Sequence, residues 1–243
     1  MLRTLLAAMA AIVMTGCATV PAEKQDPRDP LQALNRPIYD FNMDVLDAYI
    51  LRPIAVGYVE YTPVPVRRGL VNFTTNLTMP TDIANAALQG KAEHTGINVA
   101  RFLINSTLGL FGLFDVADSF GLKIADEDFG QTLGVWGVDD GAYIMMPAMG
   151  PYTSRNVAGD VVDNFVFPEI ALSLPQSILL YALKSIETRA QLIPQEKLLN
   201  ESLDPYLFMK DIYFQRQLSE VYDGKPPIKE EPVDFDEDFL ENL

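Results

Sequence analysis

The segment RFLINSTLGLFGLFDVADSFG, residues 101–121, is the feature that most restricts how this chain can fold. Its middle is apolar enough to lie in a bilayer, but Arg101, Asn105 and Asp115 interrupt it. A transmembrane helix needs roughly 20 consecutive apolar residues, so the segment is too short and too polar to span a membrane. Two interpretations remain open: burial in a protein core, or a position within the plane of a membrane interface.

The N-terminus has the layout of a secretory signal, because Arg3 precedes a short apolar core and small residues. The sequence VMTGC, residues 13–17, resembles a lipoprotein box, in which the signal is cleaved before a cysteine whose thiol carries a diacylglycerol. A plain signal peptide that happens to end near a cysteine is the alternative. We expect residues 1–16 to be the signal peptide, Cys17 to be the lipid attachment site, and residues 17–28 to be a lipidated leader.

Cys17 is the only cysteine, so no intramolecular disulfide can form. Each buried acyl methylene contributes about 0.8 kcal/mol, so a multiply acylated Cys17 would anchor the protein firmly. The next residue is Ala18, and not the aspartate that in many such lipoproteins specifies retention in the inner membrane. This resemblance indicates the periplasmic side of the outer membrane.

The length and net charge of the chain limit its number of domains and its possible partners. The 243 residues suffice for one sizeable domain, which we expect over residues 29–224. The net charge of −15 argues against binding to nucleic acid or to headgroups through a basic surface. Residues 225–243 form an acidic tail that is predicted to be disordered, although Phe235 and Phe239 within it could dock on a partner.

Apolar residues recur at spacings of three and four between leader and tail, which predicts helices and not strands. The first helix carries Ile38 and Tyr49 and is predicted to end at Pro53; the second is opened by Pro63 and Pro65. A further helix is predicted with Thr78 or Thr81 as its N-cap and Gly90 as its end. The remaining predicted helical segments are residues 91–107, 109–121, 154–166, 175–193 and 204–222, the last with Asp204 as its cap.

One region departs from this helical pattern. Residues 132–151, TLGVWGVDDGAYIMMPAMGP, place glycines around Trp136 and Tyr143. Closely spaced glycines, with Asp-Asp-Gly between apolar residues, are typical of tight turns. A short glycine-rich hairpin or a structured loop is therefore predicted near residues 135–150.

Eight blocks in order cover nearly the whole chain between leader and tail. They are DPLQALNRPIYDFNMDVLD (29–47), RRGLVNFTTNL (67–77), NAALQG (85–90), RFLINSTLGLFGLFDVA (101–117), DFGQTLGVWGV (128–138), GAYIMMPAMGPYTSRN (141–156), IETRAQL (186–192) and DPYLFMKDIYFQR (204–216). Together these blocks resemble the MlaA/VacJ lipoproteins of diderm bacteria.

The resemblance implies an all-α, ring-like arrangement of short amphipathic helices around a central amphipathic channel. It further implies a protein embedded in the inner leaflet of the outer membrane and associated with a porin trimer. Such a protein removes mislocalised phospholipid from the outer leaflet and passes it to a periplasmic carrier of the MlaC type. A structural tether or adaptor that binds porins without moving lipid is the alternative.

Polar residues within the apolar blocks are the candidates for the lining of the channel. Asn105 could equally satisfy helix ends, and Asp160 and Asp163 could simply pair with Arg155. The complete candidate set is Asn42, Asn76, Arg101, Asn105, Asp115, Arg155, Asp160 and Asp163.

The apolar residues of the opening segment are the candidates for contact with the membrane, with burial in a core as the alternative. They are Phe102, Leu110, Phe111, Leu113 and Phe114. Gly137, Gly141 and Gly150 could allow the segment around them to flex and control passage. A rigid turn that packs Trp136 and Tyr143 is the alternative for that segment.

Enzymatic function is poorly supported by the residues. Ser-His-Asp chemistry needs a histidine as general base, and the only histidine, His94, lies in the polar context KAEHTG without a G-x-S-x-G motif. One histidine and a lipidated cysteine cannot build the usual nitrogen and sulfur metal site, although an all-carboxylate calcium site stays open. No nucleotide-binding fingerprint is present either. We therefore expect a non-enzyme without a cofactor.

Overall fold

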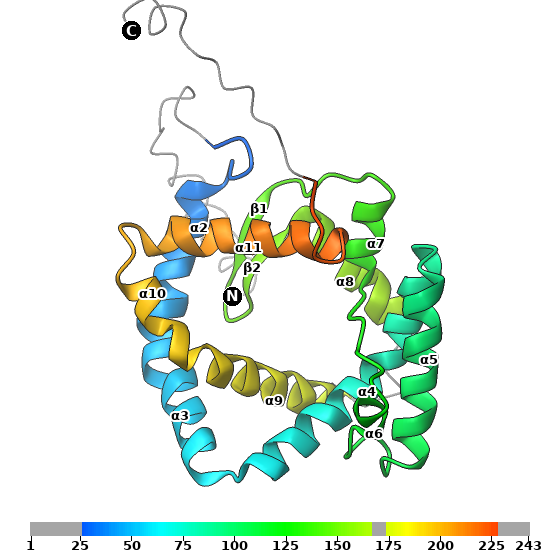
Figure 1. Cartoon of the computed structure of the whole chain (residues 1–243). Coiled ribbons are helices and arrows are strands. Elements are labelled where there is room, and N and C mark those ends of the chain that lie inside the picture. Colours follow the sequence, from blue (N-terminus) through cyan, green and yellow to red (C-terminus); the bar gives the residue numbers. More distant parts are fainter. Residues whose placement is uncertain (1–25, 167–173, 228–243) are drawn as a thin grey trace, which may run out of the picture.

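The computed structural model describes residues 26–166 and 174–227, which form a ring of helices with one small β-hairpin (Figure 1). The mostly helical, ring-like fold predicted above is confirmed. Cys17, the predicted signal peptide, most of the leader and nearly all of the acidic tail lie outside the described residues.

The elements follow one another around the ring. The first side contains α2 (Gln32–Asp40), the π-helix η2 (Phe41–Leu51) and α3 (Arg52–Tyr61). The chain then runs through α4 (Val64–Leu88), α5 (Ala92–Thr107), α6 (Val116–Ser119) and α7 (Phe129–Val135). It closes with β1 (Tyr143–Met146), β2 (Gly150–Thr153), α8 (Ser154–Val166), α9 (Leu174–Leu192), the 3-10 turn η4 (Ile193–Gln195), α10 (Glu196–Asn200) and α11 (Pro205–Val221).

The prediction that Pro53 ends the first helix is wrong. The chain continues without a break from α2 through η2 into α3 and leaves helical structure only after Tyr61. Pro53 lies in the first turn of α3, where its missing N–H and fixed φ are tolerated. Arg52 donates its backbone N–H to the Asp47 carbonyl, five residues back, so the π-helix leads directly into α3.

The prediction of a helix capped by Thr78 or Thr81 is also wrong. Both residues lie inside α4, which begins after Pro63 as predicted and contains Pro80. The Thr78 hydroxyl donates to the Thr75 carbonyl at 3.1 Å, so it bonds back along the helix instead of capping a new one. Gly90, with φ of +74°, follows the end of α4 as predicted.

Residues 109–121 do not form the predicted helix. Only α6 within them is helical, and residues 108–114 form a loop. Leu110, Phe111 and Gly112 have φ of +52°, +59° and +91°, a left-handed conformation in which a right-handed helix cannot continue. The apolar segment is therefore presented by a tight loop and not by a helix in the membrane plane.

The hairpin predicted near residues 135–150 is confirmed as the antiparallel pair β1 and β2, in which Tyr143 is opposite Thr153. It packs against α2 and α11 through a small aromatic core. The Tyr143 ring meets the Tyr206 ring edge-on with 6.1 Å between centroids. The predicted cap of α11 is also confirmed, because Asp204 accepts the Leu207 N–H at 3.1 Å.

Candidate lipid path and membrane-facing surface

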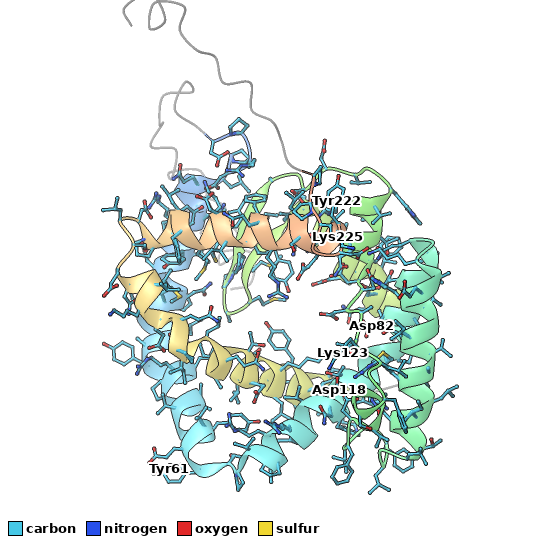
Figure 2. All side chains as sticks on the ribbon, viewed as in Figure 1. Tyr61, Asp82, Asp118, Lys123, Tyr222 and Lys225 are labelled. Carbon is cyan, nitrogen blue, oxygen red and sulfur yellow. The ribbon has the colours of Figure 1, made fainter. Side chains whose placement is uncertain are left out.

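Soluble proteins usually bury apolar side chains and expose polar ones, and this ring shows the reverse tendency. More polar or charged side chains than hydrophobic ones are buried in the described residues, while many large hydrophobic side chains are exposed. Tyr61, at the outer corner where α3 meets α4, is 80% exposed (Figure 2). Extensive exposed apolar surface is the pattern that a lipid environment favours.

The loop 108–114 carries the most concentrated apolar surface of the predicted membrane-facing residues. Phe111 is 77% exposed and Phe114 is 60% exposed; Leu110 and Leu113 are exposed as well, and Phe102 on α5 is half-buried. In the part of the chain that the structure describes, no helix combines the length and the apolar character needed to span a bilayer. The contact of these five predicted membrane-facing residues with a membrane remains a prediction.

Three of the predicted channel residues hold the base of this loop. The Arg101 guanidinium donates to Asp115 Oδ2 at 2.7 Å, and Asn105 Nδ2 donates to Asp115 Oδ1 at 3.0 Å. These donors lower the pKa of the Asp115 carboxyl, against the opposing effect of its burial. Asn105 Oδ1 also accepts the Ala117 N–H at 2.9 Å, so the cluster joins the end of α5 to the start of α6.

Asn76 supports the same loop from α4. Its side-chain amide donates to Ser106 Oγ at 3.0 Å, and its Cβ lies only 2.3 Å from where a Cβ on Gly112 would stand. The loop backbone thus passes directly over Asn76. Asn76, Arg101, Asn105 and Asp115 all make scaffold contacts here, and their predicted role in lining a channel stays a prediction.

The hairpin is fixed to the first helical segment by two asparagines that differ in burial. Asn35 on α2 is fully buried and binds both the Tyr143 carbonyl and the Met145 N–H at 2.9 Å. Asn42 on η2 binds the Met146 carbonyl and the Ala148 N–H, each at 2.9 Å. Asn35 was not among the predicted site residues, although it lies seven residues before Asn42 in the same sequence block.

A second group of residues, which the sequence did not single out as functional, ties the start of the domain to α11. Asp29, which is buried, accepts the Tyr206 hydroxyl at 2.6 Å and the Lys210 ammonium at 3.3 Å. Lys210 also pairs with Asp26 at 2.9 Å, although Lys210 is itself almost fully buried. A charged pair of this kind persists in the interior only when its remaining bonds are satisfied, and here it closes the ring beside the hairpin.

The three glycines of the predicted gate all have left-handed backbone conformations. Gly137, Gly141 and Gly150 have φ of +89°, +71° and +89°. A Cβ on Gly141 would lie 3.0 Å from the Ser154 Cβ, so the hairpin base is closely packed there. Trp136 donates its indole N–H to the Leu88 carbonyl, and Tyr143 is fully buried. These contacts hold the residues around the hairpin in place. Control of lipid passage by this segment remains a prediction.

Arg155 does not pair with Asp160 or Asp163, the pairing considered above as an alternative. Its guanidinium instead lies 2.8 Å from Asp140 Oδ1. Asp163 accepts the Asn85 amide and the Phe129 N–H, each at 2.9 Å, and thereby joins α4, α7 and α8. Burial raises the pKa of both Asp160 and Asp163, and the Tyr152 hydroxyl partly offsets this effect at Asp160.

Another carboxyl group on this side of the ring is perturbed more strongly. Asp82 is buried on α4, and its burial, together with the nearby charges of Asp126 and Asp128, raises its pKa to about 8. Figure 2 shows it on the side of the ring formed by α4, α5 and α8. Sequence reasoning missed this residue because nothing local distinguishes TMPTDIANAALQG from an ordinary amphipathic helix.

His94 belongs to a polar cluster that has three groups capable of binding metal. Its Nδ1 lies 2.7 Å from Glu127 Oε1, and one ligand atom each from His94, Glu127 and Asp223 lie within 4.8 Å of one another. The Lys91 ammonium binds both carboxylates of this group. Because a lysine already compensates their charge, the arrangement is that of an ion-pair network that links α5 to the end of α11.

Helix α9 separates the α3–α4 side of the ring from its centre (Figure 1). It packs on α3 and α4, and Leu180 is buried. Ile178 and Tyr181, which share another face of the helix, are 59% and 46% exposed.

Comparison with known proteins gives this geometry its context. The family model described as MlaA lipoprotein matches residues 27–220. The "Intermembrane phospholipid transport system lipoprotein MlaA" of Escherichia coli (strain K12) is 41% identical over 219 residues, which are 88% of this chain and 87% of that protein. The protein of the same name from Haemophilus influenzae is 34% identical over 98% of this chain and 97% of its own length.

A solved structure reported as "Structural basis for maintenance of bacterial outer membrane lipid asymmetry" has the same fold. Its TM-score is 0.75 at 41% identity, over 79% of this chain and 98% of that one. The resemblance inferred from the eight sequence blocks is thus confirmed both by sequence and by fold. The chain belongs to the MlaA lipoprotein family.

Proposed function

We propose that this protein transports phospholipid out of the outer leaflet of the bacterial outer membrane and so maintains its lipid asymmetry. The observation that carries the proposal is the ring of helices with exposed Phe and Leu side chains and interior polar contacts. The printed names of the relatives, which describe intermembrane phospholipid transport, support it.

The physical reason for a ring is the charge of the headgroup. A phospholipid that changes leaflet must move a charged headgroup through about 30 Å of hydrocarbon, where an unpaired charge is costly. A polar-lined passage removes most of that barrier while the acyl chains stay on apolar surface. Asp160 and Asp163 on α8 are candidates for the polar side of the path, and Ile178 and Tyr181 on α9 are candidates for its apolar side.

The proposed location is the inner leaflet of the outer membrane, with Cys17 as the lipid anchor. A porin trimer is the proposed partner in the membrane, and a soluble carrier of the MlaC type is the proposed acceptor of lipid on the periplasmic side. Replacement of Cys17 by Ser should release the anchor but leave residual vesicle binding through the loop 108–114. A variant that is fully soluble and monodisperse would contradict the proposed embedding.

The path can be tested with a photo-crosslinking amino acid at Tyr181, compared with one at the exposed perimeter residue Phe111. Labelled phospholipid is introduced into the outer leaflet of cells that carry either variant. Transport through the ring predicts capture at Tyr181 that depends on the presence of the periplasmic carrier. Capture at Phe111 alone would favour a tether that binds porins and contacts lipid only from outside.

The proposal does not include catalysis. His94 is the only side chain that could serve as a histidine base, and it is engaged with Glu127 at 2.7 Å. His94→Ala is expected to leave phospholipid transfer unchanged. Loss of transfer at normal protein level and normal membrane association would bring a lipid-modifying hydrolase back as the leading function.

A further inference from the structure

Arg67 and Arg68 on α4 differ from the other arginines that the structure describes. Each of the others lies in an ion pair with at least one carboxylate. Neither Arg67 nor Arg68 forms an ion pair with any described residue; Arg67 instead stacks over the Tyr58 ring at 5.8 Å. In a chain with a net charge of −15, two adjacent unpaired guanidinium groups mark a local site for an anion.

An apolar groove lies directly beside Arg68. It has a volume of about 430 Å³ and runs between the first half of α4 and the loop 108–114. Val66, Leu70, Leu113 and Phe114 contribute apolar walls, and Arg68 lines the same groove.

The groove is built by a close approach of two segments. A Cβ on Gly69 would lie 3.6 Å from the Leu113 carbonyl, and the Asn72 amide donates to that carbonyl at 3.4 Å. The loop is held in turn by the Arg101–Asp115 pair. Asp115 is the carboxylate that lines the groove, and its oxygens already accept bonds from Arg101, Asn105 and the Asp118 N–H.

We infer that this groove binds a phospholipid with a net-negative headgroup on the outside of the ring. The phosphate lies on the Arg68 guanidinium, and the upper part of an acyl chain lies along Leu70 and Phe114. Arg67, on the adjoining side of α4, adds positive potential, although Glu187 lines the hollow that it faces. A zwitterionic headgroup fits less well, because its ammonium group would be repelled by the two arginines.

The site is distinct from the proposed path through the ring, since its lining comes from α4 and residues 113–115 and includes no residue of α8 or α9. It would fix the orientation of the ring in the leaflet by one bound lipid at the perimeter. The inference rests on the proposed placement in a bilayer and not on transport itself.

The test uses the full-length lipidated protein in nanodiscs of phosphatidylethanolamine. The discs contain a small fraction of a photoactivatable lipid, either phosphatidylglycerol or phosphatidylethanolamine, with the reactive group on the acyl chain near the headgroup. After illumination, the labelled peptides are located by mass spectrometry. We expect residues 64–72 and 113–115 to be labelled about fivefold more by phosphatidylglycerol than by phosphatidylethanolamine.

Arg68→Gln should abolish this preference, whereas Arg68→Lys should keep most of it. Arg216→Gln is the matched control, because Arg216 is an exposed helical arginine that pairs with Glu220 and lies far along the chain on α11. Glutamine and arginine have similar helix propensities, so both variants should fold, and thermal unfolding verifies this. Equal labelling by the two lipids, or an unchanged preference in Arg68→Gln, overturns the inference.

The outcome is separable from that of the transport proposal. Labelling of the groove without capture at Tyr181 would retain the perimeter site and reject the path through the ring. Capture at Tyr181 with no headgroup preference in the groove would retain the path through the ring and reject the perimeter site.

Discussion

The side-chain amide of Asn42 donates a hydrogen bond to the Met146 carbonyl at 2.9 Å, which joins the π-helix η2 to the end of β1. The oxygen of the same amide accepts the Ala148 N–H, also at 2.9 Å. Ala148 has φ of +62°, an uncommon conformation for a residue with a side chain. One side chain therefore fixes the turn of the hairpin on the ring.

Asn42→Ala is predicted to loosen this turn without unfolding the ring. Two hydrogen bonds are lost, at about 1 kcal/mol each, while the bonds of Asn35 further along the hairpin remain. Hydrogen exchange should become faster over residues 146–150 and stay unchanged in α11. Asn164→Ala is the control, because the Asn164 amide donates to the Asp160 carbonyl within α8, away from the hairpin turn. Unchanged exchange at the turn would show that Asn42 does not hold it.

Phe111→Asn is predicted to weaken membrane binding through the loop 108–114. Asparagine tolerates the left-handed conformation at this position, so the change removes apolar surface without new backbone strain. Loss of an exposed phenyl group that inserts into lipid should cost roughly 2 kcal/mol. In a Cys17→Ser background, vesicle partitioning should therefore fall by more than about tenfold.

Leu203→Asn, at an exposed residue between α10 and α11, serves as the control for that experiment. It removes an apolar side chain of comparable exposure from a turn elsewhere in the ring. An equal fall in partitioning for both variants would argue against a special role of the loop 108–114.

The sequence predicted the helices whose signals are local. The Asp204 cap and the end of α4 at Gly90 depend on residues within one turn of the feature itself, so no knowledge of the fold is needed. Local residues did not reveal whether Pro53 ends a helix or lies in the first turn of one. A proline in a first helical turn and a proline that ends a helix look alike until the preceding π-helix is known.

The conformation of the loop 108–114 depends on distant contacts. Leucine and phenylalanine disfavour positive φ, yet Leu110 and Phe111 adopt it. Besides backbone bonds such as Phe111 N–H to the Ser106 carbonyl, the packing of Asn76 on Gly112 and the Arg101–Asp115 pair hold the loop from outside. Asn35 was missed for the same reason, since its partner Tyr143 lies 108 residues away. The spacing of seven between Asn35 and Asn42 was the one local indication that both lie on one helical face.

Gly112→Ala is predicted to displace the loop. The new Cβ would stand 2.3 Å from the Asn76 Cβ, and a φ of +91° is unfavourable for alanine. We expect a loss of at least about 2 kcal/mol in unfolding free energy, measured by thermal unfolding in detergent. Gly96→Ala is the control, because a Cβ there meets nothing within 4 Å and Gly96 lies inside α5. The unfolding free energy of Gly96→Ala should be unchanged or slightly higher than that of the wild type.

The last prediction concerns pH and the buried carboxyl group of Asp82. Burial and the neighbouring Asp126 and Asp128 raise its pKa to about 8, while the Glu127 N–H and Lys184 oppose that shift. In the unfolded chain the same carboxyl titrates near 4. Between these two values the folded state holds the proton and the unfolded state does not. The contribution of Asp82 to stability is therefore complete below about pH 4 and is lost progressively as the pH rises to about 8.

Asp82→Asn keeps the shape of the side chain and removes its titration. The melting temperature of the wild type, measured in detergent from about pH 5 to pH 9, should fall relative to that of Asp82→Asn as the pH rises, and the difference should level off above about pH 8. Burial also raises the pKa of Asp128, to about 6, so the absolute curve of the wild type contains more than one carboxyl group. The difference between the two proteins isolates Asp82, because Asp128 is present in both. If that difference does not change across this range, Asp82 is ionised in the folded ring, and hydrogen-bond donors or a cation must stabilise its carboxylate there.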